Sequence, residues 1–64
     1  MLYTIQNAKV FVGRRLVEDR WRATVKSRYI HDAYKKFADL YRDQNNLSLH
    51  ARVEVYGDVE VSEK

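Results

Sequence analysis

The sequence predicts a single α+β domain in which an antiparallel sheet of three strands, or of four, is covered on one face by one helix. The chain of 64 residues has the length of one small domain. One central segment has the period of an amphipathic helix, and the segments on both sides alternate apolar and polar residues as half-buried strands do. Because no Pro and only two Gly interrupt these patterns, we expect the order β-β-α-β, with a terminal β left open, over residues 1–64.

The first two elements are predicted to be strands. One strand runs from Tyr3 to Val12. In the next, the apolar residues Trp21, Ala23 and Val25 alternate with Arg, Thr and Lys. The chain reverses between them at Gly13-Arg14 or at Glu18-Asp19. Both turns stay open, because Leu16-Val17 suits either of them.

The segment from Tyr29 to Gln44 predicts an amphipathic helix. At about 100° per residue its apolar residues form one stripe free of charge, which consists of Ile30, Ala33, Tyr34, Phe37, Leu40 and Tyr41. Ser27 can cap the N-terminus with its hydroxyl. Asn45-Asn46 can end the helix, because Asn tolerates left-handed backbone geometry. We expect the aromatic members of the stripe to form core rather than a platform that stacks on bases.

The opposite side of this helix carries three acidic and three basic residues, so its charges cancel. Three pairs have the spacing of helical ion pairs, namely Asp32 with Lys36, Lys35 with Asp39, and Asp39 with Arg42. We therefore expect a solvated face here rather than a binding patch.

The segment after the helix predicts a further strand. Residues Leu49 to Tyr56 alternate apolar and polar without a break. Gly57-Asp58 then offers a tight turn, after which Val59 to Val61 would fold back as a fourth strand. Alternatively, the strand continues past a bulge at Gly57. A helical crossover places the last strand beside the first, which predicts the spatial order 2-1-3.

The residue types argue against an enzyme, a cofactor and a metal site. The chain lacks Cys, and His31 and His50 lie too far apart in sequence to match a metal-ligand spacing. It has no Gly-rich phosphate loop and no nucleophile in a recognisable setting, and its carboxylates occupy positions expected to be exposed. We expect no catalytic residue, no cofactor, and no role for either histidine.

The same composition indicates the compartment. Absence of Cys fits a reducing environment. The N-terminus lacks the pattern of a signal peptide, and no run of about 18 apolar residues is present. We expect a cytoplasmic protein without membrane contact, located in the host cell if a phage encodes it.

Positive charge is concentrated before the helix. Residues 1–36 carry +6 and residues 37–64 carry −3. Arg20, Arg22 and Lys26 share one parity, so a regular strand would place them on the sheet face away from the helix. Arg and Lys there would bind phosphates or an acidic protein surface. The alternative is that an open sheet face is simply polar.

The first hairpin has apolar residues on both faces. Val10-Phe11-Val12 and Leu16-Val17 are consecutive apolar residues, and one helix covers only one face. Phe11 is therefore exposed, self-associated or docked on a partner, unless the segment 59–61 folds over it. An aromatic residue near Arg14 and Arg15 has the composition of an interface hot spot. The candidate partner-binding residues are Phe11, Arg14, Arg15, Leu16, Arg20, Arg22, Lys26 and Arg28.

A resemblance adds a functional class to these observations. The run from Trp21 to Ser27, followed by a helix with Asp32-Ala33 near its start and by an alternating strand, resembles small phage-encoded host-takeover proteins. Within this class, the chain resembles the kind of inhibitor by which bacteriophage T7 acts on host RNA polymerase. This chain departs from it in its long N-terminal hairpin and in the spacing between strand and helix, so no functional residue is carried over. The resemblance implies a small protein that binds a host machine and blocks it.

Two functions are therefore expected. The first is a non-enzymatic inhibitor or modulator, encoded by a phage or mobile element, that presents its basic and partly apolar hairpin to an acidic surface of a host protein or protein–nucleic acid complex. The second is a nucleic-acid-binding module that lays Arg20, Arg22 and Lys26 on phosphates. A homodimer formed through the N-terminal hairpin also remains open.

Overall fold

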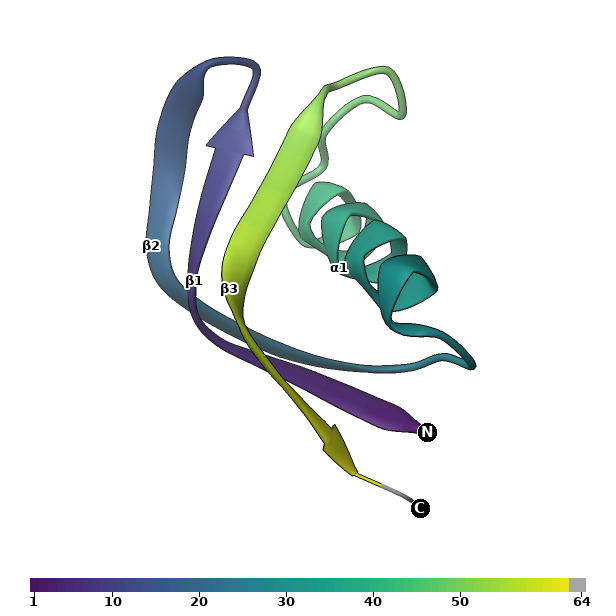
Figure 1. Ribbon diagram of the computed structural model, residues 1–64. Coiled ribbons are helices and arrows are strands. Elements are labelled where there is room, and N and C mark those ends of the chain that lie inside the picture. Colours follow the sequence, from purple (N-terminus) through teal and green to yellow (C-terminus); the bar gives the residue numbers. More distant parts are fainter. Residues whose placement is uncertain (63–64) are drawn as a thin grey trace.

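The computed structural model describes residues 1–62 and has the expected α+β architecture. Its elements are β1 (Leu2–Val12), β2 (Arg15–Lys26), α1 (Ile30–Gln44) and β3 (Val53–Ser62). The three strands form one antiparallel sheet in the order β2-β1-β3. The helix lies on one face of this sheet, and the strands bend around it (Figure 1). The predicted fold class and the predicted strand order are both confirmed.

The hairpin turn lies at Gly13-Arg14, the first of the two alternatives. Gly13 has a φ of 65°, which suits a residue without a Cβ atom, and Val12 pairs with Arg15 across the turn. Asp19 and Arg20 lie within β2, where they mark a bulge. Arg20 has a φ of 61°, and its backbone N–H donates to Asp19 Oδ1 at 3.0 Å. Turn-forming residues therefore bend an existing strand here.

β3 runs through Gly57 as a single strand, so the fourth-strand alternative is wrong. The bulge belongs to the opposite strand: Gln6 pairs with Asp58 and Lys9 with Tyr56, which leaves two residues of β1 facing Gly57. A Cβ atom on Gly57 would lie 2.9 Å from the Cα of Ala8 and 3.0 Å from the carbonyl oxygen of Gln6. Gly57 therefore allows β1 and β3 to approach each other closely, and it does not form a turn.

The core lies between α1 and the sheet. Phe37, Ile5 and Val10 are the largest fully buried side chains. The indole of Trp21 on β2 meets the ring of Phe37 edge to face, with the centroids 6.3 Å apart, and that of Tyr41 at 5.5 Å. The expectation that the aromatic stripe of the helix forms core is confirmed.

The N-terminal end of the helix differs from its prediction. The N-cap residue is Tyr29, without a side-chain cap, while the buried Ser27 donates its hydroxyl to the Tyr29 carbonyl at 3.1 Å. Ser27 lies two residues too early to cap α1. Ile30 is 46% exposed, because it begins the helix beside the loop, and burial starts at Ala33. The predicted stop is confirmed, with Asn45 as C-cap and Asn46 at a φ of 55°.

The final strand begins at Val53, four residues later than its alternation predicts. The preceding residues form a turn in which the Ala51 N–H donates to the Ser48 carbonyl at 3.0 Å. Arg42 of α1 links the helix to this loop, because its Nε donates a hydrogen bond to the Ala51 carbonyl at 2.9 Å. Leu49, expected on the buried face of a strand, is 88% exposed.

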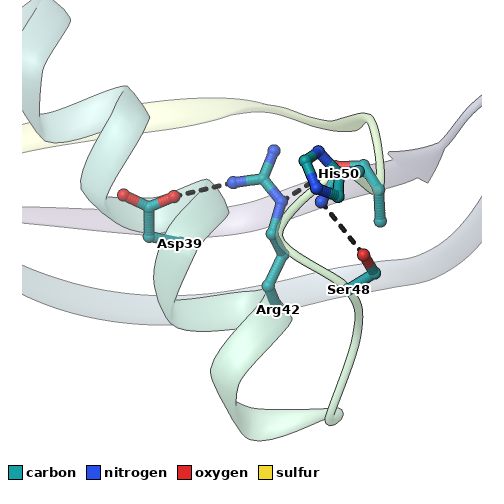
Figure 2. Close-up of polar contacts among 5 residues, drawn as sticks. Asp39, Arg42, Ser48 and His50 are labelled. Carbon is teal, nitrogen blue, oxygen red and sulfur yellow. Dashed lines mark hydrogen bonds and ion pairs between the residues drawn. The ribbon is translucent and has the colours of Figure 1, made fainter.

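Of the ion pairs predicted along the helix, the one between Asp39 and Arg42 is present, with 2.7 Å between Oδ1 and Nη1 (Figure 2). The predicted partners of Lys35 and Lys36 lie beyond ion-pair distance in the part of the chain that the structure describes. Lys36 instead donates from Nζ to the carbonyl oxygen of Lys26 at 2.5 Å, and so links the helix to the end of β2.

Candidate binding surfaces

An apolar cluster lies on the sheet face that α1 leaves open. Val10 is buried against the helix, so the adjacent Phe11 points to the other face. The Phe11 ring meets the Tyr56 ring of β3 edge to face at 5.9 Å, and Phe11 pairs with Leu16 of β2. Tyr56 is 56% exposed and Leu16 47% exposed. Phe11 itself is half-buried, so three strands contribute to one apolar cluster that is exposed at Leu16 and Tyr56.

Arginines lie at the same hairpin end of the molecule as this cluster. Arg14 and Arg15 are both exposed at the turn. The Gly13 N–H donates to the Arg52 carbonyl at 2.8 Å, which brings the start of β3 beside the turn. Arg52 is exposed and forms an ion pair with Glu54 at 3.3 Å. We call this the tip surface, and define it by Phe11, Arg14, Arg15, Leu16, Arg52 and Tyr56.

The sequence did not reveal that Arg52 and Tyr56 belong to the tip surface. Both lie in the part of the chain that carries net negative charge, and their nearness to the hairpin depends on pairing between β1 and β3. The weak signal that was available was the predicted order 2-1-3, which places the last strand beside the first.

No other segment of the described residues covers the hairpin end. Every residue from 13 to 20 is exposed, including Val17 at 41%. Val59 and Val61 pair with the N-terminal half of β1, at the far end of the sheet. The alternative in which residues 59–61 fold over Phe11 is therefore wrong. β2 is also an edge strand, so the backbone groups on its outer side have no partner strand within the described chain.

The predicted row of three cations on the open face is shorter than expected. Regular alternation holds from Trp21 onward, so Arg22 and Lys26 lie on the open face and are exposed. Arg20 lies in the bulge at positive φ, where that alternation is interrupted. Arg20 is exposed, but it does not continue the row.

Acidic residues occupy the other side of the same face. Thr4 of β1 pairs with Thr24 on one side and with Glu60 on the other, and the two threonine hydroxyls lie 2.9 Å apart. Asp58 pairs with Gln6 and shares the face with Glu60. Two strand spacings amount to about 10 Å. The open face is therefore divided into a basic edge on β2 and an acidic edge on β3.

Arg28 lies apart from the other candidates, in the loop between β2 and α1. It lines a shallow hollow of ≈ 580 Å³ together with Met1, Lys26, Ser27 and Lys36. The sequence pointed to Arg28 and Lys26 but not to Lys36. On the helix wheel Lys36 belongs to the solvated face, and only the fold of the chain brings it beside Lys26.

Two tyrosines are the described groups whose pKa values depart clearly from the ordinary one. At Tyr56 the hydroxyl donates to Glu54 Oε2 at 3.1 Å, and this hydrogen bond, with the charge of Glu54, raises the pKa although Arg52 lowers it. At Tyr41 burial raises the pKa, with a smaller contribution from Glu18. Both shifts hold the phenol in its neutral form.

The histidines occupy separate positions. The backbone N–H of His50 donates to Ser48 Oγ at 3.1 Å in the loop after the helix (Figure 2). The ring of His31 lies parallel to that of Tyr29, with the centroids 5.7 Å apart. Within residues 1–62 no three His, Cys, Asp or Glu side chains gather closely enough to hold a metal ion.

The helix of the described chain is too short and too polar to cross a membrane. A scan of protein-family models and searches of curated proteins and of solved structures find no match to this chain.

Proposed function

We propose that this protein is a non-enzymatic binding protein that docks its tip surface on an acidic surface of a larger protein. The observation that carries the proposal is the apolar cluster of half-buried Phe11 with exposed Leu16 and Tyr56, and exposed arginines at the same end of the sheet. Aromatic residues and arginine are the residue types that dominate interface energetics. Exposed apolar residues that lie together are typical of a binding site, whereas scattered ones are not.

The biological setting follows from the resemblance. Small phage-encoded host-takeover proteins bind a host machine and block it. We place this chain in that class as an inhibitor or modulator encoded by a phage or mobile element, acting in the host cytoplasm. Three arginines at the tip, of which Glu54 offsets one, suit an acidic partner and speed the encounter with it.

The first experiment is capture of a partner from nuclease-treated bacterial lysate with the immobilised protein. A stoichiometric protein that is retained by the wild type and lost with Leu16→Ala would support the proposal. Leu16 is the safest probe, since its exposure means that its removal leaves the core intact. Lys35→Ala, an exposed position on the helix, is the matched control and should retain the partner.

The second experiment measures affinity for the captured partner at two salt concentrations. Energy at protein interfaces concentrates in a few central residues, so Phe11→Ala and one or both of Arg14→Ala and Arg15→Ala should each cost about 2 kcal/mol or more. Charges at the rim should mainly change the association rate. We expect Arg22→Ala and Lys26→Ala to change mainly the association rate and to have the smaller effect on affinity.

A nucleic-acid-binding module is the second candidate function, because Arg22 and Lys26 are exposed on one face of β2. Phosphate binding would make them near-equivalent, with a salt-dependent loss at each and little effect of Phe11→Ala. That result would sink the protein-docking proposal. The acidic edge formed by Asp58 and Glu60 argues against a phosphate backbone laid across the whole face.

A further inference from the structure

The junction between β2 and α1 holds a second cationic site at the far end of the sheet from the tip surface. Lys26, Arg28 and Lys36 line its hollow of ≈ 580 Å³. Among the residues that the structure describes, no Asp or Glu lines this hollow. Cations that gather without a carboxylate favour an anion, and Arg and Lys are the side chains that bind phosphate.

A specific contact keeps two of these residues together. Lys36 donates from Nζ to the carbonyl oxygen of Lys26, which holds a cation of the helix beside the end of β2. Arg28 follows two residues later and is exposed. Because three cationic residues line one hollow, their charges would attract an anion to it.

An exposed aromatic ring lies next to the cations in the chain. Tyr29 is 53% exposed. Its ring lies parallel to that of His31, with 5.7 Å between the centroids and 2° between the planes. This stack restricts the orientation of the Tyr29 ring at the surface. Proteins that bind single-stranded nucleic acid combine a cationic groove for phosphates with aromatic rings on which bases stack.

We propose that the junction binds a nucleotide unit, with its phosphate in the hollow against Arg28 and Lys36 and its base stacked on Tyr29. The unit would belong to single-stranded nucleic acid or be a free nucleotide. Bases of a duplex are already stacked on each other, so a duplex cannot supply both contacts at once. This site goes beyond the proposed function, which rests on the opposite end of the molecule.

The test is a titration of the intact protein with a short labelled single-stranded oligonucleotide, followed by fluorescence anisotropy at several salt concentrations. Loss of base stacking with Tyr29→Ala should weaken binding roughly 5- to 150-fold. Tyr29→Phe keeps the ring and should bind as the wild type does. Arg28→Gln and Lys36→Gln should each reduce the slope of log K against log salt by about 0.7.

Lys35→Gln supplies the matched control, because it removes the same charge from the neighbouring helix position outside the hollow. It should leave the slope nearly unchanged. Arg28→Gln is the variant least expected to disturb folding, because Arg28 is exposed. Lys36→Gln removes a hydrogen bond to the backbone. Circular dichroism confirms that each variant is folded.

Competition with a mononucleotide and with a duplex of the same sequence identifies the source of the unit. Tighter binding of the oligonucleotide than of the mononucleotide assigns the site to single-stranded nucleic acid, and equal binding assigns it to a free nucleotide. The proposal is overturned if neither binds saturably, or if the duplex binds as tightly as the single strand. Equal losses for Lys35→Gln and Lys36→Gln, or wild-type binding by Tyr29→Ala, would also overturn it. None of these results bears on the tip surface.

Discussion

Two regions of this molecule carry similar apolar side chains, yet the region between α1 and the sheet is buried and the hairpin from Gly13 to Arg20 is exposed. Between α1 and the sheet, Ile5 of β1 and Phe37 of α1 have no exposed surface. At the hairpin end, Leu16 and Val17 are 47% and 41% exposed. Apolar composition alone therefore does not decide which residues enter the core. Coverage by the single helix decides it.

The lengths of the elements explain the difference. α1 has 15 residues, or about 22 Å at 1.5 Å per residue. β2 has 12 residues, or about 40 Å of strand at 3.3 Å per residue. A helix of that length cannot cover such a strand from end to end. The uncovered remainder includes the hairpin end, where the tip surface lies.

The largest expected effect separates the buried core from the exposed hairpin directly. Phe37→Ala leaves a cavity at the centre of the core and should lower the free energy of unfolding by about 3–5 kcal/mol. In a domain this small, that loss is enough to unfold most of the molecules. Leu16→Ala removes an exposed side chain and should change stability by about 0.5 kcal/mol or less. Chemical denaturation followed by circular dichroism measures both. Equal losses at the two positions would show that the hairpin end is buried in solution.

The next effect tests the close pairing of β1 and β3 beside the core. Gly57→Ala places a Cβ atom 2.9 Å from the Cα of Ala8, a contact with backbone that cannot rotate away. We expect a cost of about 1–3 kcal/mol, as for other overpacked sites. Asp58→Ala, an exposed neighbour in the same strand, is the control and should cost far less. If Gly57→Ala has the same melting temperature as the wild type, the two strands do not approach each other this closely.

A smaller effect compares the buried and the open face through their tyrosines. Well below pH 10.0, the ordinary tyrosine pKa, both phenols are neutral in the folded and in the unfolded chain, so their titration does not make stability depend on pH there. Above it the unfolded chain loses these protons first, because the folded pKa values are raised. The free energy of unfolding should therefore fall as pH rises past 10.0. Thermal melts over that range measure the fall.

Substitution and salt then assign the alkaline effect to each face. Tyr41→Phe and Tyr56→Phe should each make the fall shallower. Added salt should weaken the contribution of Tyr56, because part of it comes from the charge of Glu54 at the surface. Burial dominates at Tyr41, so its contribution should persist. A fall that neither substitution alters would assign the alkaline transition to other groups.

The smallest expected effect lies in the loop that joins the helix to β3. The imidazole of His50 is exposed, and the contact that holds the loop is made by its backbone N–H. His50→Asn should leave the melting temperature unchanged, as should a chelator added to the wild type. A melting temperature that depends on metal would contradict the assignment of no metal site.

The elements follow from local patterns, whereas the candidate sites only partly do. The helix was predictable because its period needs no knowledge of the partner that it packs on. The placement of Arg22 on the open face was also predictable, since alternation continues from Trp21. Arg20 was misplaced, because a bulge breaks alternation at Asp19-Arg20, where local composition indicates a change of direction but does not distinguish a turn from a bulge.

The sequence by itself determined the α+β class, the strand order, the amphipathic helix and the concentration of positive charge before it. These properties depend on neighbours within a few residues, or on connection rules that hold for any chain. Only the tertiary structure decided the turn at Gly13-Arg14, the role of Gly57, and the arrival of Arg52 beside the hairpin and of Lys36 beside Lys26. The physical reason is that each of these depends on contact between residues distant in the chain, and such contacts exist only once the strands have paired and the helix has packed.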